Sequence, residues 1–328
     1  MKILVVDDDP VIREILAEIL SAYGFSSCRF AASGKEALEI VQEEFSPFDC
    51  FLLDIQMPEM TGIQLTAKLR KKTDYQITPI VMITAINDRN YVDNAFSAGA
   101  TDYINKPFDI GELQARLKLI ESLVNERRNK VSLSTRNFQK SNRKVKRADL
   151  KSPLHISDID GAIDYLAMEN YLLQMSRMSL FGSCVFGVAI QDGSRIFSDL
   201  NEIEFQFIIA DVMEAISDCL KPHKFMITHV GCGTFACVRD SGRSFISKDL
   251  LRDIMTRLSE MNLHHNNGSP IIIRVTISEP IQLDLKSPKA TVHALISAAA
   301  NAEAEAEDPG HVPPSSAPFS LASIMGRN

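Results

Sequence analysis

The sequence predicts two domains of different classes, an α/β domain with a five-stranded, parallel, doubly wound sheet and then an α+β domain with an antiparallel sheet. Three observations predict this arrangement. The first 124 of the 328 residues alternate short apolar runs with helical patterns, residues 125–151 are strongly basic, and residues 152–306 carry a different order of strand and helix signals. A chain of this length can bury a hydrophobic core in each of two domains.

The strand and helix signals of the first domain follow each other in five pairs. Short, wholly apolar runs suit strands that are buried on both faces, and the segments between them repeat apolar residues at helical spacing. Five such pairs in series imply right-handed crossovers and a parallel sheet covered on both faces. The predicted strands are Ile3–Val6, Phe25–Phe30, Cys50–Leu53, Ile80–Ile83 and Thr101–Ile104, and the predicted helices begin at Pro10, Gly34, Gly62, Arg89 and Ile110, the last of them ending at Val124.

The ends of these helices carry local signals. Asp9 suits the N-cap of the first helix and Pro10 suits its first helical position. Gly24 and Gly99 are placed to end the first and fourth helices, because glycine readily adopts the backbone conformation that follows a helix.

Polar side chains gather where these strands end. Asp7 and Asp8 follow the first strand, Asp54 the third, Thr84 the fourth and Lys106 the fifth. Doubly wound sheets bind ligands at the carboxyl ends of their strands, so we expect these side chains to meet on one rim. Clustered carboxylates repel one another unless a cation neutralises them, and hard oxygen ligands suit Mg²⁺. A carboxylate beside Mg²⁺ and an ammonium group can attack a phosphoryl donor and form an aspartyl phosphate.

Four stretches of the first domain carry a resemblance to a known family. They are Val5–Pro10 with its three aspartates, Leu53–Gly62, Ile83–Ala85 and Tyr103–Phe108. Through these motifs residues 1–124 resemble the receiver domain of bacterial two-component response regulators, which has a flavodoxin-like fold. The resemblance implies that a histidine kinase or a histidine phosphotransfer protein phosphorylates this chain.

The resemblance also implies a set of residues for the phosphoryl chemistry. Asp54 would accept the phosphoryl group, and Lys106 and Thr84 would each bind one phosphoryl oxygen. Tyr103 matches the aromatic side chain that moves inward when the threonine moves, and the bond between Lys106 and Pro107 would be cis.

Mg²⁺ is the cofactor that the resemblance implies. Its ligands would be Asp8, Asp54 and the main-chain carbonyl of Gln56, and Asp7 would hold a metal-bound water. With this set the receiver would largely catalyse its own modification.

The connector at residues 125–151 contrasts with the acidic domains on either side. It carries ten basic and two acidic side chains in a chain whose net charge is -7. The fifth helix continues into it with an apolar seam at Leu113, Leu117, Ile120, Val124, Val131 and Phe138. A short coiled coil could join two protomers through this seam, giving a homodimer; alternatively, the helix packs on its own sheet and a solvated basic linker follows. A nucleic-acid-binding role is less favoured, because no recognisable DNA-binding fold surrounds the basic run.

The second domain gives its signals in the order β-α-β-β-α-β, with further helices around it. The middle strands, Phe225–Val230 and Thr234–Val238, are joined by Gly231-Cys232-Gly233, which is typical of a tight hairpin. This order predicts a ferredoxin-like, nucleotidyl-cyclase-like sheet with helices on one face. The other predicted elements are helices over 158–178, 199–220, 247–262 and 288–306 and strands over 184–190 and 271–278.

The hairpin and the order of elements at residues 152–306 resemble the GGDEF domain, the diguanylate cyclase module. The residues that would do the chemistry depart from the family pattern. Gly233 and Thr234 stand at the two acidic places of the hairpin, and Ala189 or Gln191 stands where a metal-binding aspartate ends the first strand. A cyclase needs two metal ions to neutralise a triphosphate and to activate the attacking hydroxyl.

These departures predict a catalytically inactive output domain that binds a protein partner or a nucleotide. We therefore expect a signalling protein and not an enzyme. The alternatives are an active diguanylate cyclase that makes cyclic di-GMP under receiver control, and a nucleic-acid-binding regulator that acts through the basic linker.

The remaining features of the sequence concern its compartment. Six cysteines are scattered without metal-binding spacing and are expected to be reduced thiols. No apolar run approaches the length of a membrane span or of a secretory signal, so the expected location is the cytoplasm. Residues 307–328 are rich in proline and serine and are expected to be a disordered tail.

Overall fold

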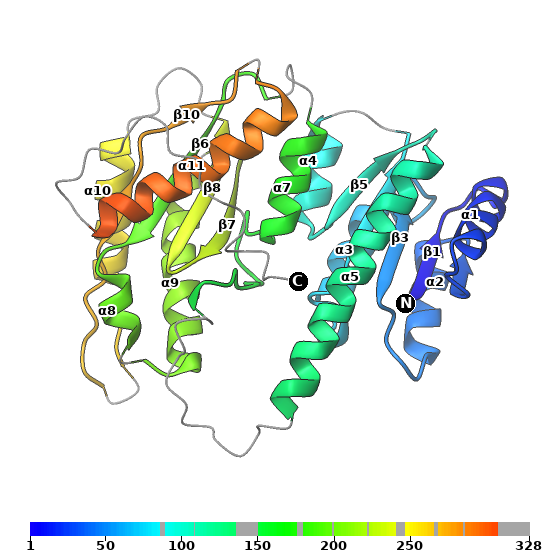
Figure 1. Ribbon diagram of the computed structural model, residues 1–328, viewed down its shortest axis with the longest axis horizontal. Helices are drawn as coiled ribbons and strands as arrows, with labels where there is room; N and C mark the ends of the chain where they lie inside the picture. Colours follow the sequence, from blue (N-terminus) through cyan, green and yellow to red (C-terminus); the bar gives the residue numbers. More distant parts are fainter. Residues whose placement is uncertain are drawn as a thin grey trace. The chain divides into compact units, whose positions relative to one another are not determined.

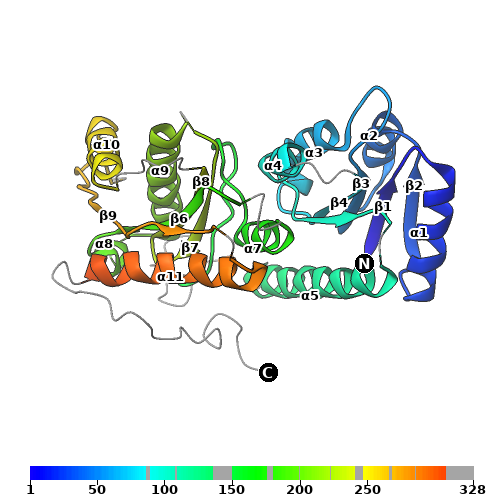
Figure 2. The same cartoon turned by 90° about the horizontal axis from the view of Figure 1, so that it is seen from above.

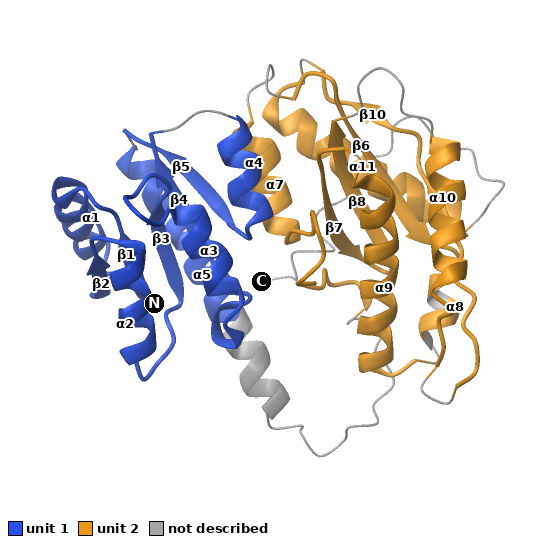
Figure 3. Cartoon of the chain, turned by 180° about the vertical axis from the view of Figure 1, so that it is seen from behind, with its two compact units in different colours: residues 1–141 blue, residues 142–328 orange. Residues whose placement is uncertain are grey.

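The chain divides into two compact units, residues 1–141 and residues 142–328 (Figure 3). The computed structural model describes residues 1–85, 89–107, 109–135, 150–175, 180–198, 200–221, 223–240, 247–265, 268–284 and 286–307. The motif residue Phe108, the seam residue Phe138, most of the basic linker and the tail after Glu307 lie outside the described residues. Within the described ranges, no helix is both long and apolar enough to cross a membrane.

Strands and helices alternate along the N-terminal unit (Figure 1). Each predicted strand and helix is present, and most ends lie within two residues of the predicted ones. The elements are β1 (Lys2–Val6), α1 (Pro10–Ala22), β2 (Ser27–Ala31), α2 (Gly34–Glu43), β3 (Cys50–Asp54), α3 (Gly62–Arg70), the short 3-10 helix η1 (Thr73–Tyr75), β4 (Ile80–Thr84), α4 (Arg89–Ser97), β5 (Asp102–Asn105) and α5 (Ile110–Thr135).

The five strands form one parallel sheet in the order β2-β1-β3-β4-β5. Helices α1 and α5 lie on one face of this sheet, and α2, α3 and α4 lie on the other (Figure 2). Strands β3 and β4 are wholly buried, because both faces are covered. The predicted parallel, doubly wound sheet is confirmed, and its order places the carboxyl ends of β1 and β3 side by side.

Local sequence signals fix the ends of two helices that flank the rim. The Asp9 side chain accepts a hydrogen bond from the main-chain N–H of Val11 at 2.8 Å, and Pro10 is the first helical residue of α1. Thr61 and Gln64 form a capping box at the start of α3, each side chain bonding the main chain of the other. The loops after β1 and β3 therefore have fixed ends.

Helix α5 is longer than predicted, and its apolar seam is buried within its own unit. Its buried residues join the core formed with α1 and the sheet: Leu113, Leu117, Ile120 and Val124. These side chains cannot also line an interface with a second protomer, so the coiled-coil prediction is wrong for this part of the seam. A homodimer through the later turns of α5 and the linker stays a prediction.

The C-terminal unit has the predicted strands, with differences in the surrounding elements. Positive φ angles at Asp158 and Gly161 exclude a helix at its predicted start, so that helix is confined to α7. A separate short helix, α8, precedes α9. The last predicted strand is shortened to β9, and a further short strand, β10, follows it. The elements are α7 (Tyr165–Gln174), β6 (Ser183–Ile190), α8 (Gly193–Ser198), α9 (Glu202–Leu220), β7 (Phe225–Gly231), β8 (Thr234–Asp240), α10 (Ser247–Glu260), β9 (Val275–Ile277), β10 (Ile281–Gln282) and α11 (Pro288–Glu307).

The second sheet is antiparallel throughout. Strand β8 lies between β6 and β7, and β9 and β10 both pair with the other edge of β6. Helices α9 and α10 cover one face, and α7 and α11 cover the other (Figure 2). The prediction of helices on one face is therefore wrong, because every residue of β6 is buried and both of its faces need cover.

Gly187 in the middle of β6 lets α11 lie close against the sheet. A Cβ atom at this position would overlap the carbonyl oxygen of Ala298 and would stand 2.9 Å from the Cα atom of Ala299. Ala189, Ala302 and Ala306 continue this contact as a cluster of small buried side chains. Small residues on both elements let strand and helix backbones approach each other.

Gly187→Ala should lower the free energy of unfolding of the C-terminal unit by about 1–3 kcal/mol, because the added methyl group must displace backbone atoms of α11. Urea unfolding followed by circular dichroism measures the change. Gly111→Ala is the control, since this exposed position in α5 faces only the flexible Asp109 carboxylate and alanine favours a helix. Unchanged stability of the Gly187→Ala chain would contradict the close packing.

Candidate functional site

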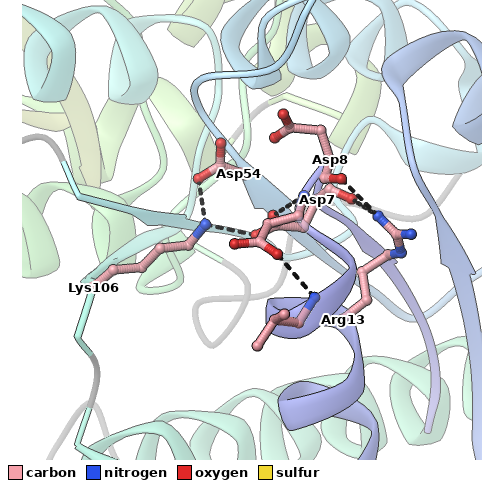
Figure 4. A network of polar contacts seen from close by, with 7 residues as sticks. Asp7, Asp8, Arg13, Asp54 and Lys106 are labelled. Carbon is pink, nitrogen blue, oxygen red and sulfur yellow. Dashed lines mark hydrogen bonds and ion pairs between the residues drawn. The ribbon is translucent and has the colours of Figure 1, made fainter.

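Three charged side chains from separate parts of the chain meet at the carboxyl end of the first sheet (Figure 4). Asp7 follows β1, Asp54 ends β3 and Lys106 follows β5. The Lys106 ammonium lies 2.6 Å from Asp7 Oδ2 and 2.9 Å from Asp54 Oδ1, so it donates a hydrogen bond to each carboxylate. Asp7 is 2% exposed and Asp54 is 5% exposed, so the shared ammonium replaces the water that these carboxylates have lost.

Main-chain contacts hold the loop after β1. Asp7 Oδ1 accepts a hydrogen bond from the N–H of Asp9 at 3.0 Å. The guanidinium of Arg13 donates to the carbonyl oxygens of Asp7 and Asp8 at 2.6 and 3.0 Å (Figure 4). The side chain of Asp8 is exposed to solvent. The sequence did not identify Arg13 as part of this region; its place in the first turns of α1, shortly after the aspartates, is the signal that could have done so.

The start of α3 lies directly against the end of β3. A Cβ atom on Gly62 would overlap the main-chain oxygen of Asp54 and would stand 3.2 Å from the Cα atom of Ile55. The N–H of Gly62 donates to the carbonyl oxygen of Ile55 at 3.0 Å. Since only backbone atoms are in the way, any side chain here would move the residue that carries the central carboxylate.

Burial and the shared ammonium act on these groups in opposite directions. Burial raises the pKa of Asp54, and the hydrogen bond and charge of Lys106 lower it without cancelling the rise. Burial works to lower the pKa of Lys106, but the bonds to Asp7 and Asp54 outweigh it and the pKa is raised. Lys106 therefore remains protonated at neutral pH.

The donor set at this rim fits a hard divalent cation. Its carboxylates outnumber its ammonium groups: Asp7, Asp8 and Asp54 stand with Lys106. Mg²⁺ takes few carboxylates and keeps several waters. In the described part of the chain, no three acidic, histidine or cysteine side chains form a group that could hold a metal alone, so main-chain oxygens and waters would complete the coordination. Gln56, the expected main-chain ligand, lies exposed in the loop after β3, and its N–H bonds to the carboxylate of Asp54.

The two predicted switch residues are both buried. Thr84 ends β4, and Tyr103 lies in β5. Burial raises the pKa of Tyr103 to about 12, so its phenol is neutral at physiological pH. Tyr103 thus already lies inward in this structure. The Lys106–Pro107 bond is cis, as predicted.

A groove of ≈ 810 Å³ adjoins the site between the loop after β3 and helix α4. Asp8 and Gln56 are part of its lining, together with Met57, Pro58 and Tyr91. Through this groove a molecule in solution can reach the exposed side of the rim.

The hairpin of the C-terminal unit is present, and side chains close around its turn. Cys232 and Gly233 form a two-residue turn with φ angles of 53° and 73°. Thr234, at one of the two acidic places, is buried. Gly233, at the other, faces the ring of Phe197, and a Cβ atom there would stand 2.7 Å from the ring. An acidic side chain at that position would therefore collide with the ring.

The segment that leads into the C-terminal unit also contacts the turn. The carbonyl oxygen of Leu150 accepts the N–H of Cys232 at 2.5 Å, and a Cβ atom on Gly231 would stand 2.6 Å from the carbonyl oxygen of Lys151. Asp192, the carboxylate that follows β6, is exposed to solvent. Among the described residues, no three acidic, histidine or cysteine side chains form a group that could hold a metal ion there.

Comparison with known proteins concerns the N-terminal unit. Residues 3–118 match the response regulator receiver domain family. Over 119 residues the chain is 42% identical to the transcriptional regulatory protein CrdR of Helicobacter pylori. This match covers 36% of this chain and 53% of CrdR. It is 40% identical over 119 residues to the transcriptional regulatory protein SrrA of Staphylococcus aureus, covering 36% of this chain and 47% of SrrA.

Among solved structures, the chemotaxis protein CheY4 of Vibrio cholerae is 33% identical, and the match covers 36% of this chain and 97% of CheY4 with a TM-score of 0.34. The chain spans about half the length of the curated relatives it matches.

Asp54→Asn should raise the free energy of unfolding of the N-terminal unit at pH 7, because burial penalises the charged carboxylate and raises its pKa in the folded state. A carboxyl with a raised pKa in the folded state loses stability as the pH rises from its unfolded pKa through its folded pKa. The difference between the two chains should therefore vanish below about pH 4.

Urea unfolding of both chains over a series of pH values measures this difference. Asp74→Asn, at an exposed carboxylate in η1, is the control and should change little. A lower stability of Asp54→Asn at neutral pH would contradict the balance of burial and pairing described above.

Proposed function

We propose, from the premise that residues 3–118 form the receiver domain of a response regulator, that the chain accepts a phosphoryl group on Asp54 and signals through its C-terminal unit. The donor would be a histidine kinase or a histidine phosphotransfer protein. The observation that carries the proposal is the ammonium of Lys106 shared between Asp7 and Asp54. This pairing holds one oxygen of Asp54 in place and keeps a positive charge beside the reacting group.

Asp54 is the nucleophile in this proposal. One of its carboxylate oxygens forms a bond to phosphorus as the bond between phosphorus and the donor histidine breaks, and the imidazole leaves with the electron pair. Lys106, 2.9 Å from Asp54 Oδ1, would donate to a phosphoryl oxygen and offset the charge that the transfer adds. Asp7 would keep the ammonium in position through its own hydrogen bond.

Asp8, Asp54 and the carbonyl of Gln56 would hold Mg²⁺, with Asp7 close by. When bound, the ion would neutralise charge on the phosphoryl oxygens and on the carboxylates. The exposed side chain of Asp8 lies at the groove beside the site, so a phosphodonor can approach there without opening the core.

Thr84 and Tyr103 would couple the phosphoryl group to the surface of the unit. The hydroxyl of Thr84 would bond a phosphoryl oxygen and so stabilise one arrangement of the end of β4 over another. Tyr103 is already buried in the unmodified chain. Its burial supports a model in which phosphorylation stabilises the inward position of the ring, and does not move the ring in from solvent.

We further propose that the C-terminal unit is a catalytically inactive, cyclase-like output domain. Numbered in chain order from β6, its strands lie in the order 4-1-3-2, which supports a ferredoxin-like fold. Gly233 and Thr234 replace the acidic pair, and Phe197 packs under the turn. Catalysis with two metal ions needs several carboxylates at one place. We infer that this unit acts by binding a protein partner or a nucleotide.

A nucleic-acid-binding output is the second candidate. The ten basic residues at 125–151 favour it, because phosphate contacts supply most non-specific affinity. CrdR and SrrA are transcriptional regulatory proteins, but both match only within the N-terminal unit. DNA binding that weakens with salt and is lost when the basic run is neutralised would support this candidate.

The wild-type chain should take up one phosphoryl group from acetyl phosphate in the presence of Mg²⁺, as measured by intact-protein mass spectrometry. Asp54→Asn should take up none, because an amide is not a competent nucleophile here. Chelation of Mg²⁺ should also prevent uptake, whereas the exposed Asp74→Asn variant should behave as the wild type does. Stoichiometric uptake by Asp54→Asn would refute the assignment.

The phosphorylated chain should form no cyclic di-GMP from GTP and Mg²⁺, because the hairpin lacks the acids that would hold two metal ions. Liquid chromatography with mass spectrometry measures the product, and an active diguanylate cyclase in the same buffer is the control. Steady product formation would overturn the inactive output domain and would leave the assignment of Asp54 intact.

A further inference from the structure

The outer side of helix α9 in the C-terminal unit carries two large apolar side chains that are open to solvent. Ile203 is 59% exposed and Phe207 is 63% exposed. They stand four residues apart, so they are neighbours on one side of the helix. Ala210, three residues further along, is partly buried and lies on the same side. Single exposed apolar residues are common on protein surfaces, whereas adjoining ones mark sites of interaction.

The packing of α9 does not need this exposed stripe. Its start is fixed by the capping box of Asn201 and Glu204, with hydrogen bonds of 2.9 and 3.1 Å. Helix α10 lies beside it on the same face of the sheet (Figure 2). The opposite side of α9 packs in the core of the unit through Phe205, Ile208, Ile209, Val212, Met213, Ala215, Ile216 and Leu220. Polar side chains on the outer side would serve the fold equally well.

Carboxylates stand at both ends of the stripe. Glu202 lies at its beginning, and Asp211 and Glu214 lie at its other end. None of these three forms an ion pair with a residue that the structure describes. Arg257 of α10 is paired with Asp218 at 2.8 Å, so it does not neutralise them by direct contact. A partner that covers this surface should therefore bring positive charge.

We propose that the α9 ridge, formed by Ile203, Phe207, Ala210 and Glu214, binds an amphipathic helix of a partner protein. These four positions follow one another at spacings of four, three and four residues, which is the spacing of a seam between two paired helices. The partner helix would cover the apolar positions with its own apolar stripe and place Lys or Arg against the carboxylates. This inference rests on the proposed role of the C-terminal unit as a binding unit, and it does not depend on phosphorylation of Asp54.

A second copy of the chain fits the α9 ridge less well than a basic helix does. In a parallel pair, Glu214 of one copy would face Glu214 of the other, and like charges across an interface are unfavourable. In an antiparallel pair, Glu214 would face the apolar positions of the other copy and lose its contact with water without gaining a counter-charge. The pattern of charges therefore favours a basic partner over a homodimer at this surface.

Two synthetic peptides of about 20 residues, long enough to form a helix, test the role of charge. Both carry leucines at the spacing of the α9 ridge, with lysines beside the leucines in one peptide and glutamates in the other. Fluorescence anisotropy of each labelled peptide, titrated with the full chain, measures the affinity. The lysine peptide should bind at least about tenfold more tightly, and added salt should weaken its binding. Equal affinities, or no binding of the lysine peptide, would overturn the proposal.

Matched variants test whether the peptide binds at the α9 ridge. Phe207→Asp should abolish binding of the lysine peptide although it adds negative charge, because the apolar contact is lost. Phe181→Asp makes the same change at a residue outside α9 that is 62% exposed, so it should bind as the wild type does. Glu214→Gln should weaken binding about threefold. Glu279→Gln, at an exposed carboxylate between β9 and β10, should leave it unchanged.

Circular dichroism shows whether each variant is folded, and analytical ultracentrifugation shows whether the chain pairs with itself. Binding of the lysine peptide that survives in folded Phe207→Asp would overturn the proposal. A wild-type dimer that Phe207→Asp dissociates would assign the α9 ridge to a second copy and would also overturn it. Neither result would change the uptake of phosphate at Asp54 or the expected absence of cyclic di-GMP, so a failure here is distinct from a failure of the proposed function.

Discussion

The shared hydrogen bonds of Lys106 to Asp7 and Asp54 satisfy two carboxylates that have almost no access to water. Removing a carboxylate from water is costly, and one ammonium offsets only part of that cost for two of them. The arrangement is stable because the sheet and the start of α3 hold these residues in position. Parallel strands place the three residues at one rim, and the contact of Gly62 with the end of β3 holds Asp54. The site is therefore pre-organised, and part of the negative charge of its carboxylates is not compensated by Lys106.

Most of the N-terminal unit could be predicted from the sequence because its signals are local. The central strands β1, β3 and β4 are largely apolar, helices begin at caps such as Asp9, and strand ends carry polar residues, so the order of elements and the rim follow from spacing. The spacing of apolar residues along a helix does not show which surface its apolar face packs against. The seam from Leu113 to Val124 is apolar whether it packs on its own sheet or on a second protomer, and the sheet is the partner found. Arg13 was missed for a similar reason, because it binds main-chain oxygens and leaves no pattern among side chains.

The C-terminal unit shows the same division between local and long-range signals. The glycines around Cys232 predict a tight hairpin, and the positive φ angles at Cys232 and Gly233 are the backbone reason. The cover over the turn comes from residues distant in sequence, Phe197 and Leu150, and no local pattern indicates it. This cover has a consequence for the proposed inactive output. Restoring an acidic residue at Gly233 alone would not rebuild a metal site, because the ring of Phe197 occupies the space that its side chain needs.

Helix α11 contributes both the closest packing and a pocket of the C-terminal unit. Around Gly187 its small residues bring two backbones together, whereas near the hairpin the same run of alanines leaves a space. A larger apolar side chain at the pocket would bury more surface and gain contacts, and cavities and unpaired hydroxyls both reduce stability. Thr234 adds to this loss, because its buried hydroxyl bonds no residue that the structure describes and valine has nearly the same shape. Simple packing therefore does not explain why Ala299, Ala300 and Thr234 stand together beside Glu303.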